Sequence, residues 1–461
     1  MKFFLILTAL VFVSSFNCLC AYSYDAPPEI FDSSKYTELI GKHGESKKYK
    51  IVVPFTGPDG TSDEVAMKKV DLVGDEYTRG VAHGVMLAED IAEFIKIKLP
   101  VFYAEMVEDL DVSGLPTFLQ IKIKKFGLKA PGIMDEALSW VYQNEEEYMP
   151  PRLIDEMNGI ADGICMKLGG NCDVSVWLEE IRRANMLPEL IRMACTAYGA
   201  WGKASGGSDT AGLVQTRALD FGGGPFANYT VIAVHHNEGM RSFAMVSWPG
   251  FVGAVTGIAE NGVGISEKVW MTNDKKNIQK GSYDGIPDVF VLRDILQNSE
   301  NRQDADAYVQ SINRTWAIFI GVGDFYSQKF DIIGYKQSDA TVYDEETMPT
   351  VTGQPPMESL VYVDKHPQPS NDGATGTLPT ALGDFYGDIS ASNSRTILQY
   401  HGTGDVHIAI YDYVANEMLV SIGRINRKGE YKPEGGEDDS AWKAYNRPYL
   451  RFSLDKLWNS N

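Results

Sequence analysis

Three side chains able to form a cysteine-based catalytic site lie on one predicted β-hairpin. Cys195 opens the β-prone segment 194–203, and Arg217 and Asp220 lie near the far end of a second β-prone segment, 213–221. Gly, Ser and Asp residues between the two segments supply the backbone freedom that a reversing chain needs. Because a hairpin folds its second strand back along the first, a residue about 22 positions after Cys195 can return to the thiol. A thiol, a guanidinium and a carboxylate could therefore share one site.

The same residues also fit a structural role, because a single Cys in an apolar stretch is commonly a packing residue. Arg217 and Asp220 could equally form a buried ion pair. The cysteine count favours a reactive thiol, since Cys165 and Cys172 could close a short disulfide and leave Cys195 unpaired. The alternative is that all three cysteines stay reduced, and their spacing alone does not decide between the two arrangements.

The composition describes a large globular protein with a strongly acidic surface. Its 461 residues, 44% of them hydrophobic, can bury a sizeable core in one large domain or in two closely packed layers. A formal charge of −20 repels nucleic acid, so we expect no nucleic-acid partner. The acidic balance also suits work at low pH, where protonation of carboxylates relieves their mutual repulsion.

The first residues predict entry into the secretory pathway. Lys2 is followed by a short apolar run and by small residues around Ala21, as in a signal peptide over residues 1–21. No later segment has the roughly 18 consecutive apolar residues that a membrane-spanning helix requires. Sequons at Asn228 and Asn313 predict glycosylation. We therefore expect a secreted or lysosomal glycoprotein.

The chain before Cys195 differs in pattern from the chain after it. After a poorly ordered or extended arm over residues 22–48, helical patterns dominate up to residue 187. Within them, a basic amphipathic stretch, 91–128, could be a solvated helix face or a patch that contacts membrane lipid. Beyond Cys195, β-prone runs alternate with turn residues and two helices, and residues 355–383 read as a long surface loop. This order predicts an α+β fold with antiparallel sheets and helices outside them.

In combination, these segments resemble the cysteine N-terminal-nucleophile (Ntn) hydrolases of the acyl-coenzyme A:isopenicillin N acyltransferase, acid ceramidase and N-acylethanolamine acid amidase family. The resemblance covers roughly residues 65–425. No single motif is specific to the family, but the motifs taken together are. It implies a four-layer αββα sandwich of antiparallel sheets with a mainly helical N-terminal segment. The stretches that carry it are Leu72–Gly74, Arg79–Gly84, Met157–Gly163, Ala194–Ala204, Arg217–Asp220, Gly257–Gly264, Pro287–Leu296 and Arg395.

The resemblance implies that a precursor cuts itself between Ala194 and Cys195. The segments 22–194 and 195–461 would then stay associated as two chains. A thiol can attack the carbonyl of its own preceding peptide bond, and hydrolysis of the resulting thioester frees an N-terminal cysteine. The new α-amine has an unperturbed pKa of about 7.7 to 8.0, so it can act as the general base for the adjacent thiol.

The family pattern also assigns roles to the charged residues. Arg217 would orient the substrate, Asp220 would hold the α-amine through a charge-assisted hydrogen bond, and Arg395 would brace these groups. One position departs from the pattern, because Asp364 stands where relatives carry the asparagine that binds the oxyanion. A carboxylate stabilises an oxyanion only when it is protonated. The oxyanion site would otherwise use backbone N–H groups, Asn393 or Lys268.

The function that the resemblance implies is hydrolysis of a linear, non-peptide N-acyl amide, such as ceramide or an N-acylethanolamide, through a Cys195 thioester. Alternatives are an acyltransferase or a phospholipase B-like deacylase, since the thioester can pass its acyl group to another nucleophile. A catalytically silent lipid-binding glycoprotein is a third interpretation. The chain lacks Cys-x-x-Cys, His-Glu-x-x-His and phosphate-loop spacings, so we expect no metal or cofactor. The expected partners are the lipid amide and either a lipid-presenting protein or a membrane surface.

Overall fold

The computed structural model describes residues 24–57, 60, 62–103, 112–126, 132–191, 194–209, 211–221, 224–237, 240–272, 282–424 and 442–459. The signal peptide expected over residues 1–21 lies outside these residues. Among the residues described, no helix combines the length and the apolar composition needed to cross a membrane.

The predicted hairpin is confirmed and belongs to a seven-stranded sheet. β5 (Ala194–Ala200) and β6 (Val214–Asp220) pair antiparallel, with the short helix α7 (Gly202–Gly206) between them. Gly207 ends α7 with a φ of +70°, a conformation that favours glycine. The sheet order is β1 (Ile30–Asp32), β17 (Tyr449–Ser453), β16 (Glu417–Ile422), β15 (His407–Asp412), β6, β5 and β14 (Leu360–Val363).

A second sheet has ten strands and contains the other predicted hairpins. Neighbouring strands run antiparallel except for β4 and β7, which pair in parallel. Their order is β13 (Ala340–Tyr343), β12 (Lys329–Lys336), β11 (Ala317–Asp324), β10 (Gly264–Val269), β9 (Thr256–Ala259), β8 (Phe243–Ser247), β7 (Val231–His236), β4 (Ser62–Val73), β3 (Ser46–Thr56) and β2 (Thr37–His43).

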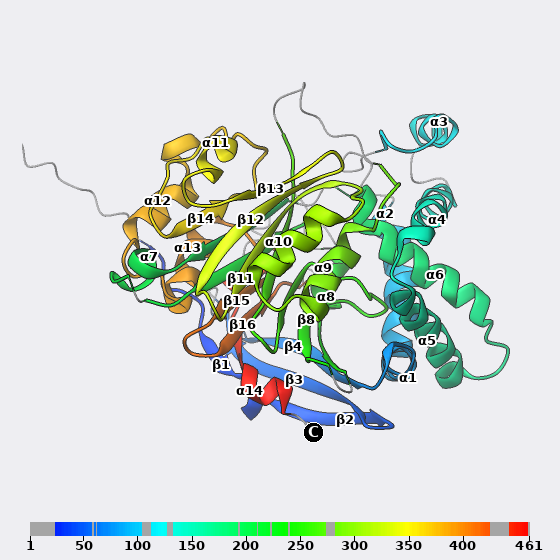
Figure 1. Ribbon diagram of the computed structural model, residues 1–461. Helices are drawn as coiled ribbons and strands as arrows, with labels where there is room; N and C mark the ends of the chain where they lie inside the picture. The colour runs from blue at the N-terminus through cyan, green and yellow to red at the C-terminus, as the bar shows by residue number, and fades with distance from the viewer. Residues whose placement is uncertain are drawn as a thin grey trace, which may run out of the picture.

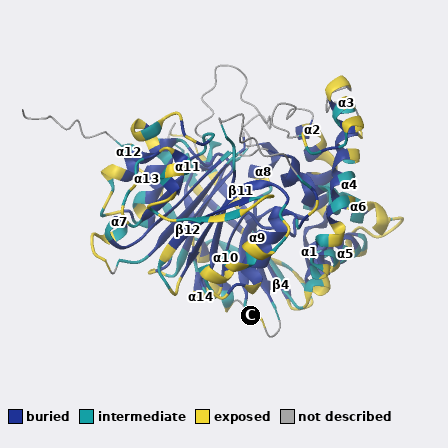
Figure 2. Ribbon diagram, turned by 45° about the horizontal axis from the view of Figure 1, so that its top comes forward, coloured by how far each residue is buried: buried dark blue, intermediate teal, exposed yellow. Residues whose placement is uncertain are grey.

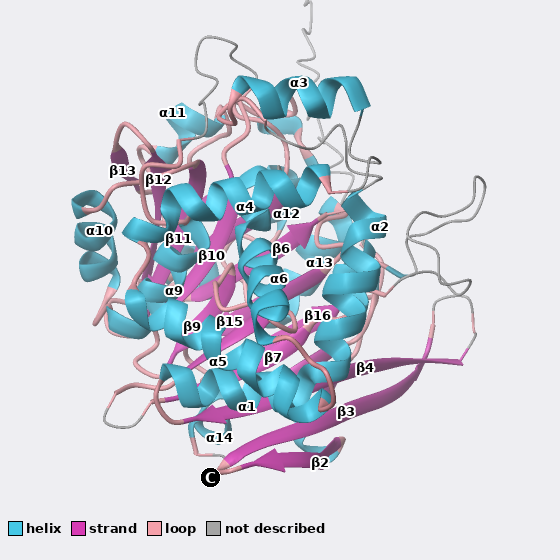
Figure 3. Ribbon diagram, turned by 90° about the vertical axis from the view of Figure 1, so that its right-hand side faces the viewer, coloured by secondary structure: helices cyan, strands magenta, loops and turns pink. Residues whose placement is uncertain are grey.

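The two sheets face each other, and helices cover both outer surfaces (Figures 1 and 3). One apolar cluster fills the space between the sheets, a second lies between the ten-stranded sheet and its helices, and a third lies under the helices of the seven-stranded sheet. The ten-stranded sheet is covered by α1 (Glu76–Glu93), α4 (Ile133–Glu145), α5 (Pro151–Leu168), α6 (Val174–Met186), α9 (Asp288–Asn298) and α10 (Arg302–Ser311), and the other sheet by α12 (Thr377–Asp384) and α13 (Ala391–His401). The expected αββα sandwich is therefore confirmed.

Burial follows these layers. The strands are buried along most of their length, and the exposed residues lie on the outer faces of the helices and in the connections (Figure 2). A strand covered on both faces reads as a continuous apolar run. This explains why β7, β8 and β11, which are buried throughout, stood out in the sequence.

Two expectations about irregular segments are wrong. The supposed arm over residues 22–48 contains β1, β2 and the start of β3, because these strands find partners in both sheets. The supposed loop over residues 355–383 contains most of α12. The segment before Cys195 thus begins with strands, and its helices follow from α1 onward.

The segments on either side of the Ala194–Cys195 bond are interleaved. β1 pairs with β17 in the seven-stranded sheet, and β4 pairs with β7 in the ten-stranded sheet. Helices α1 and α5 pack closely because small residues meet at their contact, and a Cβ placed at Gly163 would lie only 2.3 Å from Val81 O. Neither segment therefore has a complete sheet or core of its own.

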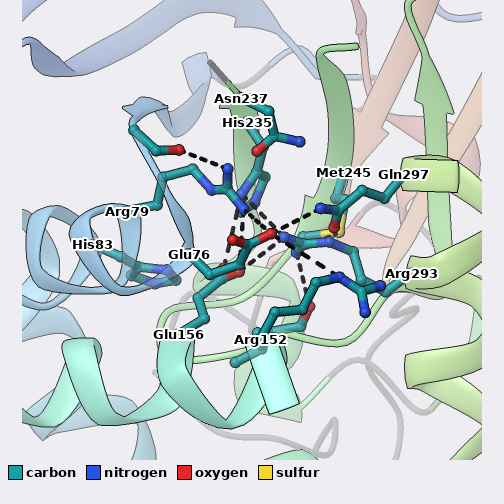
Figure 4. Close-up of polar contacts among 12 residues, drawn as sticks. Glu76, Arg79, His83, Arg152, Glu156, His235, Asn237, Met245, Arg293 and Gln297 are labelled. Carbon is teal, nitrogen blue, oxygen red and sulfur yellow. Dashed lines mark hydrogen bonds and ion pairs between the residues drawn. The ribbon is translucent and has the colours of Figure 1, made fainter. Parts of the chain in front are cut away.

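A buried network of charged side chains also joins the two segments (Figure 4). Glu156 of α5 accepts a hydrogen bond from Arg293 of α9 at 2.9 Å, and it lies 3.8 Å from both Arg79 of α1 and His235 of β7. Removing one partner of such a buried network leaves the others unpaired in a low dielectric, which is strongly unfavourable. The network therefore opposes separation of α1 and α5 from α9 and β7.

Candidate active site

The register of the hairpin places the predicted residues around one peptide bond. Cys195 lies directly opposite Leu219, and Ala194 lies directly opposite Asp220. Arg217 is two residues before Leu219, so its side chain leaves β6 on the same face as that of Leu219. The hairpin thus brings the guanidinium to the thiol and the carboxylate to the Ala194–Cys195 bond.

The guanidinium of Arg217 is the centre of a dry polar cluster. Arg217 and Cys195 are fully buried, and Nη2 of the arginine donates to the cysteine Sγ at 3.3 Å. The same Nη2 donates to Oε2 of Glu267 at 3.0 Å, and Nη1 donates to Nε2 of His407 at 2.9 Å. The planar fork of an arginine suits several simultaneous acceptors, which a lysine could not match.

Glu267 brings the second sheet into the site. It lies on β10, and its Oε2 is 3.9 Å from the Sγ of Cys195, within reach of a thiol proton. Burial raises the pKa of Glu267, and the positive charge of Arg217 opposes that shift. Its other carboxylate oxygen, Oε1, has no hydrogen-bond partner among the described residues. The site therefore contains a carboxylate that can accept a proton beside the thiol.

His407 holds the arginine rather than acting as a base. An arginine can only donate, so Nε2 of His407 must accept, and the ring proton therefore lies on Nδ1. Thr256 Oγ1 is 3.0 Å from the same Nε2, and Trp248 packs against the ring with centroids 5.7 Å apart. Burial and Arg217 hold the pKa of His407 well below its usual value, so the imidazole stays neutral.

The thiol of Cys195 is protonated in the intact chain. Burial raises its pKa well above the usual value, Arg217 opposes that rise, and the charge of Glu267 adds to it. A buried thiolate requires a compensating charge. To become a nucleophile, the thiol must therefore transfer its proton to a neighbouring group. Arg217 is placed to balance the negative charge that then forms on sulfur.

Asp220 lies beside the peptide bond rather than beside the sulfur. Its carboxylate accepts hydrogen bonds from Thr403 Oγ1 at 2.5 Å and from Gly404 N at 2.7 Å. The hydroxyl of Thr403 is also 2.8 Å from that of Thr196, one residue after the nucleophile. Burial and the neighbouring Asp405 raise the pKa of Asp220 to about 7. The carboxylate forms no ion pair with a described residue, although the charge of Lys365 acts on it, so a cation formed at the nitrogen of Cys195 would be stabilised beside it.

A buried lysine faces the nucleophile from the second sheet. Nζ of Lys268 donates to Val269 O at 2.8 Å, and the side chain forms no ion pair within the described part of the chain. Ser266 lies on the same face of β10 and donates to Thr216 O of β6 at 3.2 Å, so Lys268 also points toward the seven-stranded sheet. Burial lowers the pKa of Lys268, and negative charge at Cys195 would oppose that shift.

The other predicted site residues lie elsewhere. Asn393 donates to Asp388 Oδ2 at 2.9 Å, and Arg395 donates to Ser392 O at 3.1 Å, so both are engaged within or next to α13. Neither side chain contacts Cys195 or Arg217, and the expected bracing role of Arg395 and oxyanion role of Asn393 have no basis in this geometry. The resemblance matched Asn393 and Arg395 by their position in the sequence. It could not show that α13, which carries both, lies on the outer face of its sheet.

Asp364 is buried near the site but is held by its own neighbours. Its Oδ1 accepts from His366 N at 3.0 Å and from Gln368 Nε2 at 3.1 Å, and Gln354 donates to Oδ2. Both carboxylate oxygens thus already accept hydrogen bonds from neighbouring residues. An oxyanion role for Asp364 is therefore unfavourable in this arrangement.

An apolar cavity adjoins the cluster. It has a volume of about 20 Å³, close to that of a single water molecule. Trp248 connects it to the cluster through His407, and three of its wall residues precede the Ala194–Cys195 bond. The wall consists of Leu187, Pro188, Ile191, Phe221, Phe226, Trp248, Phe251, Gly253, Val255 and Val289.

The remaining predicted residues concern covalent modification. Cys165 and Cys172 form a disulfide with Cα atoms 5.2 Å apart, and Cys195 is the free cysteine of the described residues. Asn228 and Asn313 are both exposed, as an acceptor asparagine must be.

Sequence reasoning did not single out Glu267 and His407. Both lie in strands far from the hairpin in sequence. Pairing of β15 with β6 within one sheet brings His407 to Arg217, and packing of the second sheet on the first brings Glu267 there. One local signal existed, because Glu267 and Lys268 are consecutive charged residues within a β-prone run. Charged residues are rarely fully buried without a partner, so such a pair inside a strand marks a candidate site.

Comparison with known proteins gives two relatives over most of the chain. The chain is 31% identical over 435 residues to protein dcd1B of Dictyostelium discoideum, covering 91% of this chain and 79% of dcd1B. It is 30% identical over 475 residues to protein dcd1A of the same organism, covering 99% of this chain and 98% of dcd1A. No family model matches the chain.

Solved structures show only distant likeness. An N-acylethanolamine-hydrolyzing acid amidase ortholog of Caenorhabditis elegans has a TM-score of 0.35 and 15% identity, covering 48% of this chain and 93% of that one. A mutant of the conjugated bile acid hydrolase of Clostridium perfringens has a TM-score of 0.31 and 9% identity, covering 57% and 93%.

Proposed function

The chain belongs to the family of the Dictyostelium proteins dcd1A and dcd1B, and we propose that it is a self-processing cysteine amidohydrolase with Cys195 as its nucleophile. The observation that carries the proposal is the placement of one buried guanidinium, that of Arg217, in contact with both the thiol and the carboxylate of Glu267. A structural ion pair would not require a thiol at its centre. Perturbed titratable groups gathered beside a nucleophile are typical of active sites.

The first reaction is cleavage of the Ala194–Cys195 bond. Sγ of Cys195 attacks the carbonyl carbon of Ala194 as Glu267 accepts the thiol proton, and Arg217 balances the negative charge. The C–N bond then breaks, the proton passes to the departing nitrogen, and Ala194 is left as a thioester on sulfur. Water hydrolyses that thioester, which gives a carboxylate on Ala194 and restores the thiol.

The second reaction uses the amine that the first one frees. The α-amine of Cys195 forms opposite Asp220, whose carboxylate holds it through a charge-assisted hydrogen bond. The amine takes the thiol proton as Sγ attacks the carbonyl of a bound amide, and it returns a proton to the leaving amine. The acyl thioester is then hydrolysed by water.

Lys268 is proposed to stabilise the oxyanion of these reactions. It presents a buried ammonium from the opposite sheet, which donates to Val269 O and lies 5.9 Å from the ring centroid of Phe319 but forms no ion pair among the described residues. A preorganised cation in a water-excluded site stabilises developing negative charge strongly. Lys268 is one of the alternatives that the resemblance left open for the oxyanion, beside Asp364, Asn393 and backbone N–H groups.

The substrate class follows from the apolar cavity. Its wall carries no charged side chain, so it suits a hydrocarbon acyl group rather than a peptide. Three of the wall residues, Leu187, Pro188 and Ile191, belong to the segment that ends at the Ala194–Cys195 bond. Cleavage after Ala194 releases the end of that segment, and we propose that the cavity then opens to admit the acyl chain of a lipid amide. A secreted or lysosomal location and contact with a lipid surface complete this proposal.

The test uses amides that differ only in the acyl group. Acetyl, octanoyl and palmitoyl amides of a fluorogenic amine are incubated with the cleaved protein and with a Cys195→Ala variant. We expect release of the amine by the wild type alone, with kcat/KM rising at least tenfold from acetyl to the longer chains. Absence of release from the whole series by a fully cleaved protein would contradict the proposal and favour the silent lipid-binding interpretation.

A further inference from the structure

A surface cavity of about 320 Å³ lies against the face of the ten-stranded sheet that α1 covers. Strands β3, β4 and β7 each contribute residues to its lining, and α1 forms one side. The lining includes none of the residues that contact Cys195. The cavity is therefore separate from the candidate active site.

The charged side chains of the lining balance one another. Lys50 and Lys68 are its two bases, and Asp90 and Glu93 are its two acids. Lys68 is paired with Asp90, and Lys50 lies directly opposite Glu38 on β2. A balanced lining does not select an ion, but it places ammonium donors beside carboxylate acceptors. It suits a neutral ligand whose hydroxyl groups both donate and accept hydrogen bonds.

The rest of the lining provides apolar contact. Leu87, Val231 and Pro249 border the cavity together with Tyr229. The ring of Tyr229 is held in place by stacking on Phe94, with centroids 5.2 Å apart. Pockets that combine apolar walls with a few polar groups bind ligands that have both kinds of surface. A sugar ring is such a ligand, because its C–H groups form apolar faces and its hydroxyl groups lie around the edge.

A glycosylation sequon forms part of this lining. Asn228 ends the short helix α8 (Gly224–Asn228), is exposed and borders the cavity. Asn313, in the other sequon, is also exposed but does not border the cavity. A sugar attached to Asn228 would start at the cavity, so its binding there would be intramolecular and favoured by a high effective concentration.

We propose that this cavity holds the first N-acetylglucosamine of an N-glycan attached to Asn228. Its volume lies at the lower end of the range of about 300–1,000 Å³ that is typical of small-molecule sites. It would therefore take one sugar residue and leave the rest of the glycan outside. The hydroxyl groups of that residue would meet Lys68 and Asp90, and one of its C–H faces would lie against Tyr229.

Attachment of the glycan needs a lipid-linked oligosaccharide pyrophosphate, which the secretory pathway of the cell supplies. Nδ2 of Asn228 forms a bond to C1 of the sugar, the bond from C1 to the pyrophosphate oxygen breaks, and Nδ2 loses one proton. The pyrophosphate leaves with the electrons of the broken bond. The proposal thus depends on the expected signal peptide, but not on Cys195 or on any hydrolase activity.

The bound sugar would join the segments on either side of the Ala194–Cys195 bond. It would be attached covalently to Asn228, which follows that bond, and would contact Lys68 and Asp90, which precede it. A ligand that binds only the assembled form stabilises that form. A glycan on Asn228 would therefore stabilise the folded protein, whereas a glycan on an exposed loop would not.

The test compares the two glycans of one protein. The uncut Cys195→Ala protein is secreted from cells that add N-glycans. It is then treated in the folded state with peptide-N-glycosidase F, which cuts the bond between asparagine and sugar. Mass spectrometry of peptides follows the release at Asn228 and at Asn313 separately, so each protein carries its own control.

A second comparison fills the cavity. Ala66 borders it and lies on β4 two residues before Lys68, so its side chain leaves the strand on the same face. Ala66→Trp would therefore occupy the place of the sugar. Thr341→Trp, at an exposed position of the edge strand β13, is the matched control. Ala66→Leu replaces the tryptophan variant if that variant does not unfold cooperatively on heating.

We expect release at Asn228 to be at least tenfold slower than at Asn313 in the folded protein, and the two rates to become similar after denaturation. Ala66→Trp should abolish the difference, and Thr341→Trp should leave it unchanged. Asn228→Gln should lower the melting temperature by several degrees, and Asn313→Gln should not.

Four results would each overturn the proposal. They are an Asn228 without a glycan in the secreted protein, equal release at the two sites in the folded protein, protection of Asn228 that survives Ala66→Trp, and equal melting temperatures of Asn228→Gln and Asn313→Gln.

Discussion

At the scale of single residues, Arg217 divides its hydrogen-bond donors among three partners. Its two terminal nitrogens contact Cys195, Glu267 and His407, and all four side chains are buried. The guanidinium therefore balances the negative charge of the Glu267 carboxylate first. When the thiol has lost its proton, it balances the charge of the Cys195 thiolate. A flexible ammonium could satisfy one of these partners but not all three.

The variant Arg217→Lys tests whether the guanidinium must donate to all three partners. The variant keeps the charge and loses the fork, so we expect cleavage after Ala194 to slow by at least about tenfold, since one lost preorganised donor costs roughly 10²–10³ in rate. The fraction cleaved over time is read by mass spectrometry. Arg447→Lys is the control, because Arg447 is also buried and donates to Asp63 at 2.8 Å, far from the thiol. Equal rates for both variants would argue against a specific role of Arg217.

A buried group of acids makes stability depend on pH. Burial raises the pKa of Glu145 well above its usual value, and Glu189 and Asp288 raise it further. A raised folded-state pKa contributes stability that is complete below the unfolded pKa of about 4.3 and is lost as the pH rises through the folded value. Glu145→Gln removes this dependence, so it should raise the melting temperature at about pH 8 relative to wild type and change it little at about pH 4.

The Glu145 measurement compares thermal unfolding of both proteins in a Cys195→Ala background. Each unit of pKa elevation corresponds to about 1.4 kcal/mol, so the difference between the two pH values should amount to roughly 3 °C or more. A difference independent of pH would show that Glu145 is not protonated in the folded protein. The nearby hydrogen bond from Asp288 N to Glu189 Oε1, at 2.7 Å, is untouched by the substitution.

At the scale of elements, the contact of α1 with α5 sets how tightly the helix layer packs. A Cβ at Gly163 would lie 2.3 Å from Val81 O, and one at Gly84 would lie 2.2 Å from Ile160 O. We expect Gly163→Ala to lower the melting temperature by several degrees, because overpacking costs about 1–3 kcal/mol. Gly383→Ala in α12 is the matched control, since its nearest neighbour would be an ordinary 3.9 Å away. Equal melting temperatures of the two variants would contradict this packing argument.

The elements also show what the sequence could predict. Hairpins such as β7–β8 were marked by turn residues between buried apolar runs, which is local information. β1 and β2 were missed because a short strand near one end depends on its partner, and β1 pairs with β17 at the other end of the chain. Within the site, the hairpin predicted the meeting of Cys195 and Arg217. Glu267 could not be predicted, because it reaches them only through the packing of one sheet on the other.

At the scale of the whole molecule, cleavage at one bond should leave the assembly intact. Strands from both segments pair within each sheet, and the network around Glu156 crosses between the segments. We expect the two products to co-elute in size-exclusion chromatography and to separate only in denaturant. Separate elution without denaturant would show that these contacts do not suffice to hold the segments together.

Cys195 is proposed to be a nucleophile that first acts on its own chain. The most direct measurement is the intact mass and N-terminal sequence of the purified protein over a range of pH, beside a Cys195→Ala variant. We predict a chain that begins at Cys195 in the wild type and a single uncut chain in the variant. A wild type that stays in one piece throughout, or a variant cut at the same bond, would contradict the account.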